Sequence, residues 1–90
     1  MVNSVSEREI VVGKKSISNY LIDIAVVFQE GVSAIVIKGY GRYISKAVDL
    51  YNALTDKMRD AVKLDSVAIG SEPVAGRLKS YIAIKVTRKL

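Results

Sequence analysis

The chain has 90 residues, 50% of them hydrophobic, with a formal net charge of +5 and a sequence pI near 9.6. This length and apolar content favour a single globular domain, residues 1–90, and exclude a disordered chain. Neither cysteine nor histidine is present. Disulfides are therefore excluded, and the usual metal ligands and the commonest general base are missing, so we expect no cofactor and no metal.

Hydropathy and charge narrow the class further. No apolar run reaches the roughly 18 residues that a membrane-spanning helix needs. Residues 1–4 are polar and lack the apolar core of a signal peptide, so we expect a cytoplasmic protein. The basic excess indicates a polyanionic partner, although a solvated basic surface would give the same composition. No acid follows Glu72, whereas five basic residues do: Arg77, Lys79, Lys85, Arg88 and Lys89.

The first predicted unit is a strand at residues 9–12, which follows a polar lead at residues 1–8. Gly13 then opens a basic loop that contains Lys14 and Lys15. These lysines form either an ordinary exposed turn or part of a phosphate-binding site. A similar loop later in the chain favours the phosphate-binding interpretation.

A helix is predicted from a cap at Ser16 or Ser18 to about Glu30, where Gly31 ends it in the left-handed conformation. Apolar residues at helical spacing should face a sheet, and these are Ile17, Tyr20, Leu21, Ile24 and Phe28. Three further apolar residues make this stripe wider than one packed face: Ile22, Val26 and Val27. Another element or subunit should therefore cover part of it.

The second predicted unit is a strand at residues 33–38 followed by a glycine-rich basic loop. Because its apolar core is unbroken, this strand should be central and buried on both faces. Gly39 and Gly41 allow a tight turn and a close approach of the backbone to a partner. Three cations lie in or beside the turn with no acid between them: Lys38, Arg42 and Lys46. A strand, a glycine loop, basic residues and a helix start make a phosphate-binding arrangement.

The two units have the same design. If their strands are parallel neighbours, a right-handed crossover brings both basic loops to the same end of the sheet, where they form one patch. A second helix is predicted at residues 43–60, with an inner face of Ile44, Ala47, Val48, Tyr51, Leu54 and Met58. At its entrance, Tyr40 and Tyr43 either pack as core or dimer aromatics or stack on nucleic-acid bases.

A hairpin completes the chain. We predict a third strand at residues 64–70, a turn at residues 70–76 around Pro73, and a fourth strand at residues 79–88. The tip carries Arg77 and Lys79. Such a hairpin either lies along a nucleic-acid groove or forms a charged edge that blocks aggregation. The predicted fold is an α+β two-layer sandwich of β-α-β-α-β-β order, with a mixed four-stranded sheet, two helices on one face and a basic C-terminal hairpin.

A set of short motifs extends over almost the whole chain. They are Gly13-Lys14-Lys15, Asn19-Tyr20, Gly31-Val32-Ser33, Ile35-Val36-Ile37-Lys38, Gly41-Arg42, Ile44-Ser45-Lys46-Ala47-Val48-Asp49 and Gly70-Ser71. In these motifs the chain resembles the Alba family of small archaeal chromatin and RNA-binding proteins. The resemblance implies a homodimer or heterodimer whose basic body lies across a duplex, with two hairpin arms reaching along it. It places Lys14, Lys15 and Arg42 in the body, and Arg77 and Lys79 in the arm.

From the loops and the resemblance together we predict a nucleic-acid-binding site of Lys14, Lys15, Tyr40, Arg42, Lys46, Arg77 and Lys79. Lys14 aligns with a family lysine known for acetylation, which would remove a phosphate-facing charge. The chain also departs from the family. Tyr40 stands where the family loop often has arginine, and the hairpin between residues 70 and 82 looks shorter than in the best-known members. Met58 stands where some members use phenylalanine for dimer–dimer contacts. We therefore expect weaker or altered cooperative packing on DNA, and a heterodimer is one expected form.

The leading hypothesis for function is nucleic-acid binding without sequence specificity. Phosphate contacts would coat or bridge double-stranded DNA in archaeal chromatin, on the chromosome, and also bind RNA. One alternative is an RNA-binding or RNA-chaperone subunit of a ribonucleoprotein, and another is a protein-interaction scaffold whose charge is incidental. An enzyme is not expected, because the acids are dispersed. Asp56 and Asp60 share one helix with basic neighbours, which is typical of a solvated face.

Overall fold

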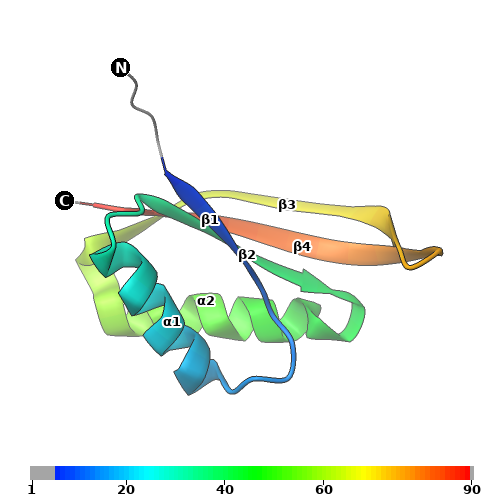
Figure 1. Ribbon diagram of the computed structural model, residues 1–90, viewed down its shortest axis with the longest axis horizontal. Coiled ribbons are helices and arrows are strands. Elements are labelled where there is room, and N and C mark those ends of the chain that lie inside the picture. Colours follow the sequence, from blue (N-terminus) through cyan, green and yellow to red (C-terminus); the bar gives the residue numbers. More distant parts are fainter. Residues whose placement is uncertain (1–5, 90) are drawn as a thin grey trace.

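The computed structural model describes residues 6–89, which form a mixed four-stranded sheet with two helices on one face (Figure 1). The elements are β1 (Glu7–Val11), α1 (Ile17–Gln29), β2 (Ala34–Tyr40), α2 (Ile44–Met58), β3 (Val62–Val74) and β4 (Arg77–Arg88). Short 3-10 turns flank α2 at Gly41–Tyr43 and Arg59–Ala61. The predicted fold class and element order are confirmed. Of the polar lead expected at residues 1–8, residues 1–5 lie outside the described part, and Glu7 and Arg8 belong to β1.

The strands are ordered β1-β2-β4-β3 across the sheet. β1 pairs in parallel with β2, β2 pairs antiparallel with β4, and β4 pairs antiparallel with β3. Because β1 and β2 are parallel neighbours, the segments that follow them leave the sheet at the same end, as the matching sequence units predict. In Figure 1 the segment after β1 lies at the bottom of the molecule, and the segment after β2 lies to its right.

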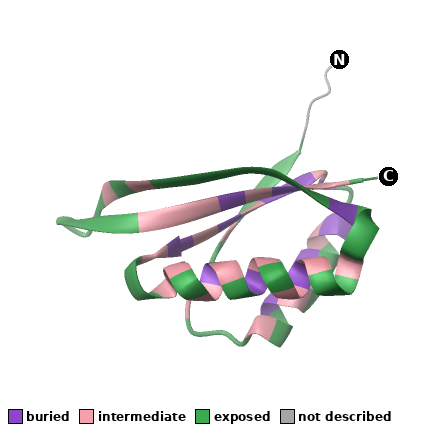
Figure 2. Ribbon diagram, turned by 180° about the vertical axis from the view of Figure 1, so that it is seen from behind, coloured by how far each residue is buried: buried purple, intermediate pink, exposed green. Residues whose placement is uncertain are grey.

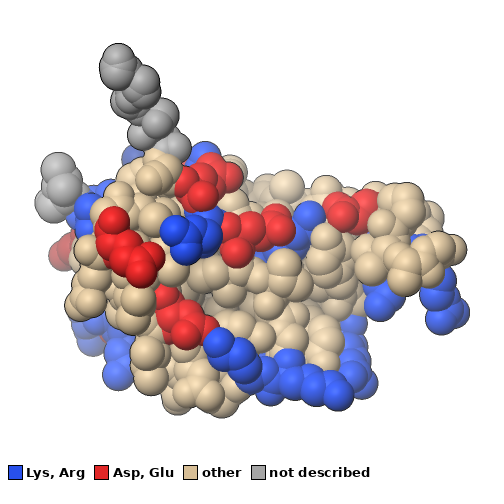
Figure 3. Space-filling view, in the orientation of Figure 1, with Lys and Arg blue, Asp and Glu red and all other residues tan. Residues whose placement is uncertain are grey.

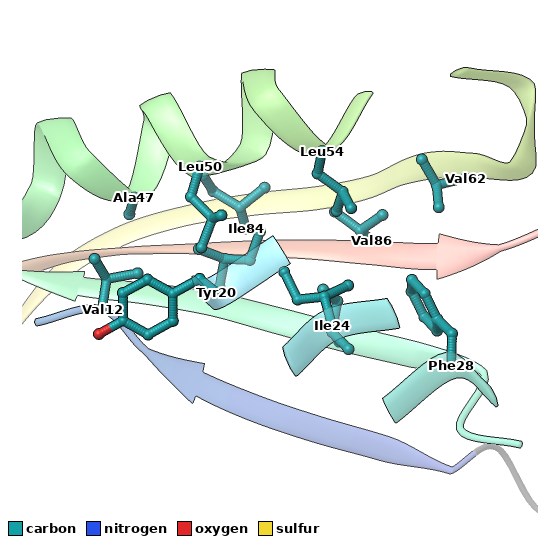
Figure 4. Close-up of a cluster of buried hydrophobic side chains, with 12 residues drawn as sticks. Val12, Tyr20, Ile24, Phe28, Ala47, Leu50, Leu54, Val62, Ile84 and Val86 are labelled. Atoms are coloured by element: carbon teal, nitrogen blue, oxygen red, sulfur yellow. The ribbon is translucent and has the colours of Figure 1, made fainter. Parts of the chain in front are cut away.

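The core lies between the sheet and the two helices (Figure 4). Its buried residues include Tyr20, Ile24 and Phe28 of α1, Ala47, Leu50 and Leu54 of α2, and Ile35, Ile37, Ile84 and Val86 of the sheet. Val36, Lys38 and Tyr40 alternate with the core residues of β2 and are half-buried on the other face. The central position of β2 is confirmed. The expected burial of both its faces is wrong, because both helices cover the same face.

Local sequence signals account for the ends of α1. The Ser16 side chain caps the helix by accepting a hydrogen bond from the Asn19 N–H at 3.2 Å. Gly31 follows the helix with a φ of 95°, the left-handed conformation expected of a C-terminal glycine. Of the residues that widen the apolar stripe, Val27 packs against the core, whereas Ile22 and Val26 are exposed.

The hairpin is longer than predicted. β3 continues through the expected turn to Val74 and β4 begins at Arg77, so the turn is confined to Ala75 and Gly76. Pro73 is tolerated within β3 because this edge strand has a ladder partner on one side only. The last residue of β2, Tyr40, pairs with Tyr81. Residues 71–80 therefore pair only with each other and extend past the sheet as an arm, roughly 15 Å long at ~3.3 Å per residue.

Candidate nucleic-acid interface

Lys46, in the first turn of α2, joins the two basic loops. Its Nζ donates hydrogen bonds to the carbonyl oxygens of Gly13, at 2.7 Å, and Lys15, at 2.6 Å. The Gly13 N–H in turn donates a hydrogen bond to the Tyr20 hydroxyl at 2.7 Å. The loop after β1 is thus fastened both to the helix that follows it and to the helix that follows β2. The basic residues of the two loops become parts of one surface.

Tyr43 lies among positive charges that come from both loops. The Arg42 guanidinium donates a hydrogen bond to the Tyr43 hydroxyl at 3.2 Å, and its Cζ lies 5.2 Å from the centre of the Tyr43 ring. This hydrogen bond, together with the charges of Arg42, Lys14 and Lys46, lowers the pKa of Tyr43 below its ordinary value of 10.0, although burial opposes the shift. The positive electrostatic potential at the Tyr43 hydroxyl therefore comes from cations of both loops.

Lys14 and Lys15 are both exposed but differ in their partners. The Lys15 ammonium forms an ion pair with Asp23 of α1 and lies 5.1 Å from the centre of the Tyr20 ring. Part of its charge is therefore already compensated. Lys14 and Arg42 form no ion pair with any residue between 6 and 89. The positive charges of these two side chains are therefore not compensated by an acid among those residues.

Two glycines shape the turn after β2, for different reasons. Gly41 has a φ of 54°, which a residue with a side chain rarely adopts. At Gly39 a Cβ would collide with the carbonyl oxygen of Tyr43 and lie 2.9 Å from the Cβ of Ala47. β2 and the start of α2 therefore approach each other closely at this point. That close approach fixes the positions of Arg42 and Tyr43 in the turn between β2 and α2.

The arm supplies a second group of cations. Arg77 begins β4 and Lys79 follows two residues later; both are exposed, and neither forms an ion pair within the described part of the chain. Figure 3 shows basic side chains in a row along the lower right edge of the body and in a second group beneath the hairpin tip. The outline of the molecule is hollowed between the two groups. In this view the acidic side chains lie on the upper and left parts of the molecule, away from the hollow.

Tyr40 and Lys38, which precede the turn, contact the arm. The Tyr40 hydroxyl donates a hydrogen bond to Glu72 Oε2 at 2.9 Å, and Lys38 Nζ lies 3.2 Å from Glu72 Oε1 and 3.9 Å from Glu9 Oε2. The Tyr40 ring packs edge-on against Tyr81, with 6.1 Å between ring centroids. Of the three cations predicted beside the turn, Arg42 alone has no carboxylate or carbonyl partner within residues 6–89.

Met58, at the end of α2, is half-buried and packs against the core. Its role in contacts between dimers stays a prediction. Across residues 6–89, no three acidic, cysteine or histidine side chains lie close enough to hold a metal ion. In the same part of the chain, no helix is both long and apolar enough to cross a membrane.

Sequence reasoning missed the structural roles of Lys46 and Glu72. A lysine that donates to carbonyl groups looks in sequence like one that binds phosphate, and its acceptors here lie more than thirty residues away in the chain. Glu72 gave one signal, as the last acid before a purely basic segment. For Tyr43 the adjacent Arg42 was the only local indication.

Comparisons with known proteins agree with this architecture. The sequence profile of the Alba family matches residues 8–71. DNA/RNA-binding protein Alba 2 of Saccharolobus solfataricus is 44% identical over 82 residues, which cover 90% of this chain and 92% of that protein. DNA/RNA-binding protein Alba of Nanoarchaeum equitans is 34% identical over 88 residues, covering 90% and 98%. The solved structure of Alba from Thermoplasma volcanium superposes with a TM-score of 0.79 at 31% identity, covering 89% of this chain and 99% of that one. The chain belongs to the Alba family.

Proposed function

We propose that this protein binds double-stranded DNA and RNA without sequence specificity, through phosphate contacts from the two loops and the arm. Lys14 and Arg42 of the body and Arg77 and Lys79 of the arm are the principal phosphate-binding side chains, and Lys15 supports them. The observation that carries the proposal is that Lys46 fastens the two loops into one basic surface, which borders the hollow beneath the hairpin (Figure 3). Relatives from two archaea are named DNA/RNA-binding proteins, which supports both ligands.

Contacts of this kind give affinity without reading bases. Each neutralised phosphate releases counterions, so affinity falls with salt, and four contacts per protomer correspond to a slope of log K against log salt of about −3.6. We call this quantity the salt slope. The proposal assigns the chain a binding role on the chromosome, in the cytoplasm, and gives it no catalytic step.

We also propose that the protein acts as a dimer. Leu64, Val67 and Ile69 of β3 lie opposite Val86, Ile84 and Ile82 of β4, so they point to the helix-covered face of the sheet. The helix α2 packs against β2 and β4 and leaves these β3 residues exposed, by 42%, 51% and 79%. Leu78, 75% exposed, continues this apolar row on β4. Figure 2 shows β3 as exposed along most of its length.

An apolar row of this length is typical of an interface. A second copy with the same row would cover it and carry a second arm, so that one dimer presents two bodies and two arms to the duplex. Another Alba-type chain with a matching row would form a heterodimer in the same way. Met58 is proposed to contact neighbouring dimers on the nucleic acid. Acetylation of Lys14 would weaken binding by removing one charge, and Lys14→Gln mimics that loss.

Equilibrium binding of a random-sequence DNA duplex and a matched RNA duplex across a salt series tests the proposal. Tight binding of both, falling steeply with salt, supports it. Strong DNA binding with weak RNA binding points to chromatin alone, and the reverse points to a ribonucleoprotein subunit. Failure to bind either duplex at low salt would refute nucleic-acid binding and leave the protein-interaction scaffold as the explanation.

A further inference from the structure

The arm leaves the sheet at one sharply defined place. β2 ends at Tyr40, whose partner on β4 is Tyr81, and the neighbour of Tyr81 on β3 is Gly70. Up to this rung of the ladder β4 pairs with β2 as well as with β3, and α2 packs against β2 and β4. Beyond this rung two strands continue alone. A two-stranded ribbon without further support twists and bends readily, so the direction of the arm depends on what holds its root.

The root of the arm, where Tyr40, Tyr81 and Gly70 lie side by side, is held by the Glu72 carboxylate, which reaches across β4. Glu72 lies on β3 and its two partners, Lys38 and Tyr40, lie on β2, with β4 between them. Each carboxylate oxygen has its own partner: Oε1 lies 3.2 Å from Lys38 Nζ, and Oε2 accepts the Tyr40 hydroxyl at 2.9 Å. The Lys38 side chain is only 15% exposed, so this ion pair is shielded from salt more than a surface pair is.

Tyr81 of β4 packs against the residues that bind Glu72. Lys38 Nζ lies 4.6 Å from the centre of the Tyr81 ring and 5.2 Å from that of Tyr40. The Tyr81 ring also lies close to the backbone of Gly70, where a Cβ would come within 3.0 Å of the Tyr81 hydroxyl oxygen. The groups form a continuous layer over three strands, on the face of the sheet opposite the helices.

We propose that Lys38, Tyr40, Tyr81 and Glu72 form a brace that fixes the direction of the arm, and that Tyr40 serves nucleic-acid binding by positioning Arg77 and Lys79. The inference rests on the proposed function. An arm held in place before binding loses less conformational freedom when its cations meet phosphates, so the complex is tighter without any additional contact.

Two further observations support the brace. In the strand register Glu72 lies directly opposite Lys79, yet its carboxylate turns toward Lys38 and Tyr40. Glu72 therefore binds Lys38 and Tyr40, where the arm leaves the sheet, and does not neutralise Lys79. Hydrogen bonds from Tyr40 and Lys38 also lower the pKa of Glu72 below its ordinary value of 4.5, so the carboxylate is ionised at neutral pH.

Charge and positioning predict opposite effects for one substitution. Glu72→Gln removes a negative charge beside a polyanion-binding surface, so electrostatics alone predicts tighter binding. The brace predicts weaker binding, by about three- to tenfold or roughly 0.7–1.4 kcal/mol, with an unchanged salt slope because no phosphate-binding cation is lost. Tyr40→Phe, which changes no charge and keeps the ring, should weaken binding in the same direction.

Amide 15N order parameters of the arm, residues 71–80, provide a second readout that needs no nucleic acid. The brace predicts lower values in both variants, with the order parameters of α1 and α2 unchanged. Asp65→Asn is the matched control, since Asp65 lies on the same strand, pairs with Lys85 and does not contact the root. This control should bind at least as tightly as the parent and keep a rigid arm.

Unchanged order parameters in Glu72→Gln and Tyr40→Phe would overturn the brace, even if binding weakened, because Tyr40 would then act by direct contact. Tighter binding of Glu72→Gln, matching Asp65→Asn, would also overturn it. If the parent protein binds no duplex, the proposed function fails, while the order parameters still decide whether the brace holds the arm.

Discussion

The substitution Lys46→Met tests whether Lys46 holds the two loops together or contacts nucleic acid directly. Methionine keeps most of the apolar stem and removes the ammonium that donates to the Gly13 and Lys15 carbonyls at 2.7 and 2.6 Å. Hydrogen bonds from a charged donor contribute about 1.5–3 kcal/mol each. Both acceptors lie in a loop that water can reach in part, so we expect a total loss of about 1–2 kcal/mol after rehydration.

For a domain of this size that loss lowers Tm by about 4–15 °C, measured by circular dichroism at one fixed protein concentration. Affinity for a DNA duplex should fall because the loop that carries Lys14 is no longer held. The salt slope should change by much less than the ~0.9 that one lost phosphate contact removes. Lys14→Met is the matched control and should do the reverse, lowering the salt slope while leaving Tm unchanged. A Lys46→Met protein with unaltered Tm and a salt slope reduced by about 0.9 would refute the assignment.

Three further outcomes follow from the geometry. Gly39→Ala should lower the free energy of unfolding by about 1–3 kcal/mol in urea titrations, because its Cβ meets backbone, whereas Gly13→Ala meets its nearest atom at 3.7 Å and should be tolerated. The Tyr43 hydroxyl should titrate below 10.0 by 13C NMR and return toward that value in Arg42→Gln. Because the pKa of Tyr43 is lowered in the folded protein, ionisation of Tyr43 adds to folding stability only as pH rises above that folded pKa. The tyrosinate that then forms should weaken duplex binding at alkaline pH, and Tyr43→Phe should abolish this alkaline loss of affinity. Ile69→Glu should give a folded monomer by analytical ultracentrifugation, and a folded dimer would contradict the proposed interface.

Much of the fold could be predicted because its signals are local. The Ser16 cap, the left-handed Gly31 and the helical spacing of Tyr20, Ile24 and Phe28 each depend on a few neighbouring residues. The common design of the two strand–loop–helix units also sufficed to predict that their loops meet, because parallel neighbouring strands leave few alternatives.

The sequence did not settle features that depend on distant neighbours. Pro73 indicated a turn, yet it lies within β3, because the sheet order makes β3 an edge strand. The apolar run of β2 predicted burial of both faces, because such a run does not reveal that both helices cover the same side. Among the basic residues, the sequence could not distinguish Lys46, which donates to carbonyl groups, from Lys14, which has no ion-pair partner within residues 6–89.

The salt slope of duplex DNA binding tests the central claim most directly. It should be compared between the parent and the double variant Arg42→Gln/Arg77→Gln, which loses one cation from the body and one from the arm. If body and arm both contact phosphates, each substitution should lower the magnitude of the salt slope by about 0.9 per protomer, and the pair should lower it by about 1.8. Thermal unfolding should show that the variant remains folded. A folded double variant with the salt slope of the parent would contradict the account, because neither cation would then neutralise a phosphate.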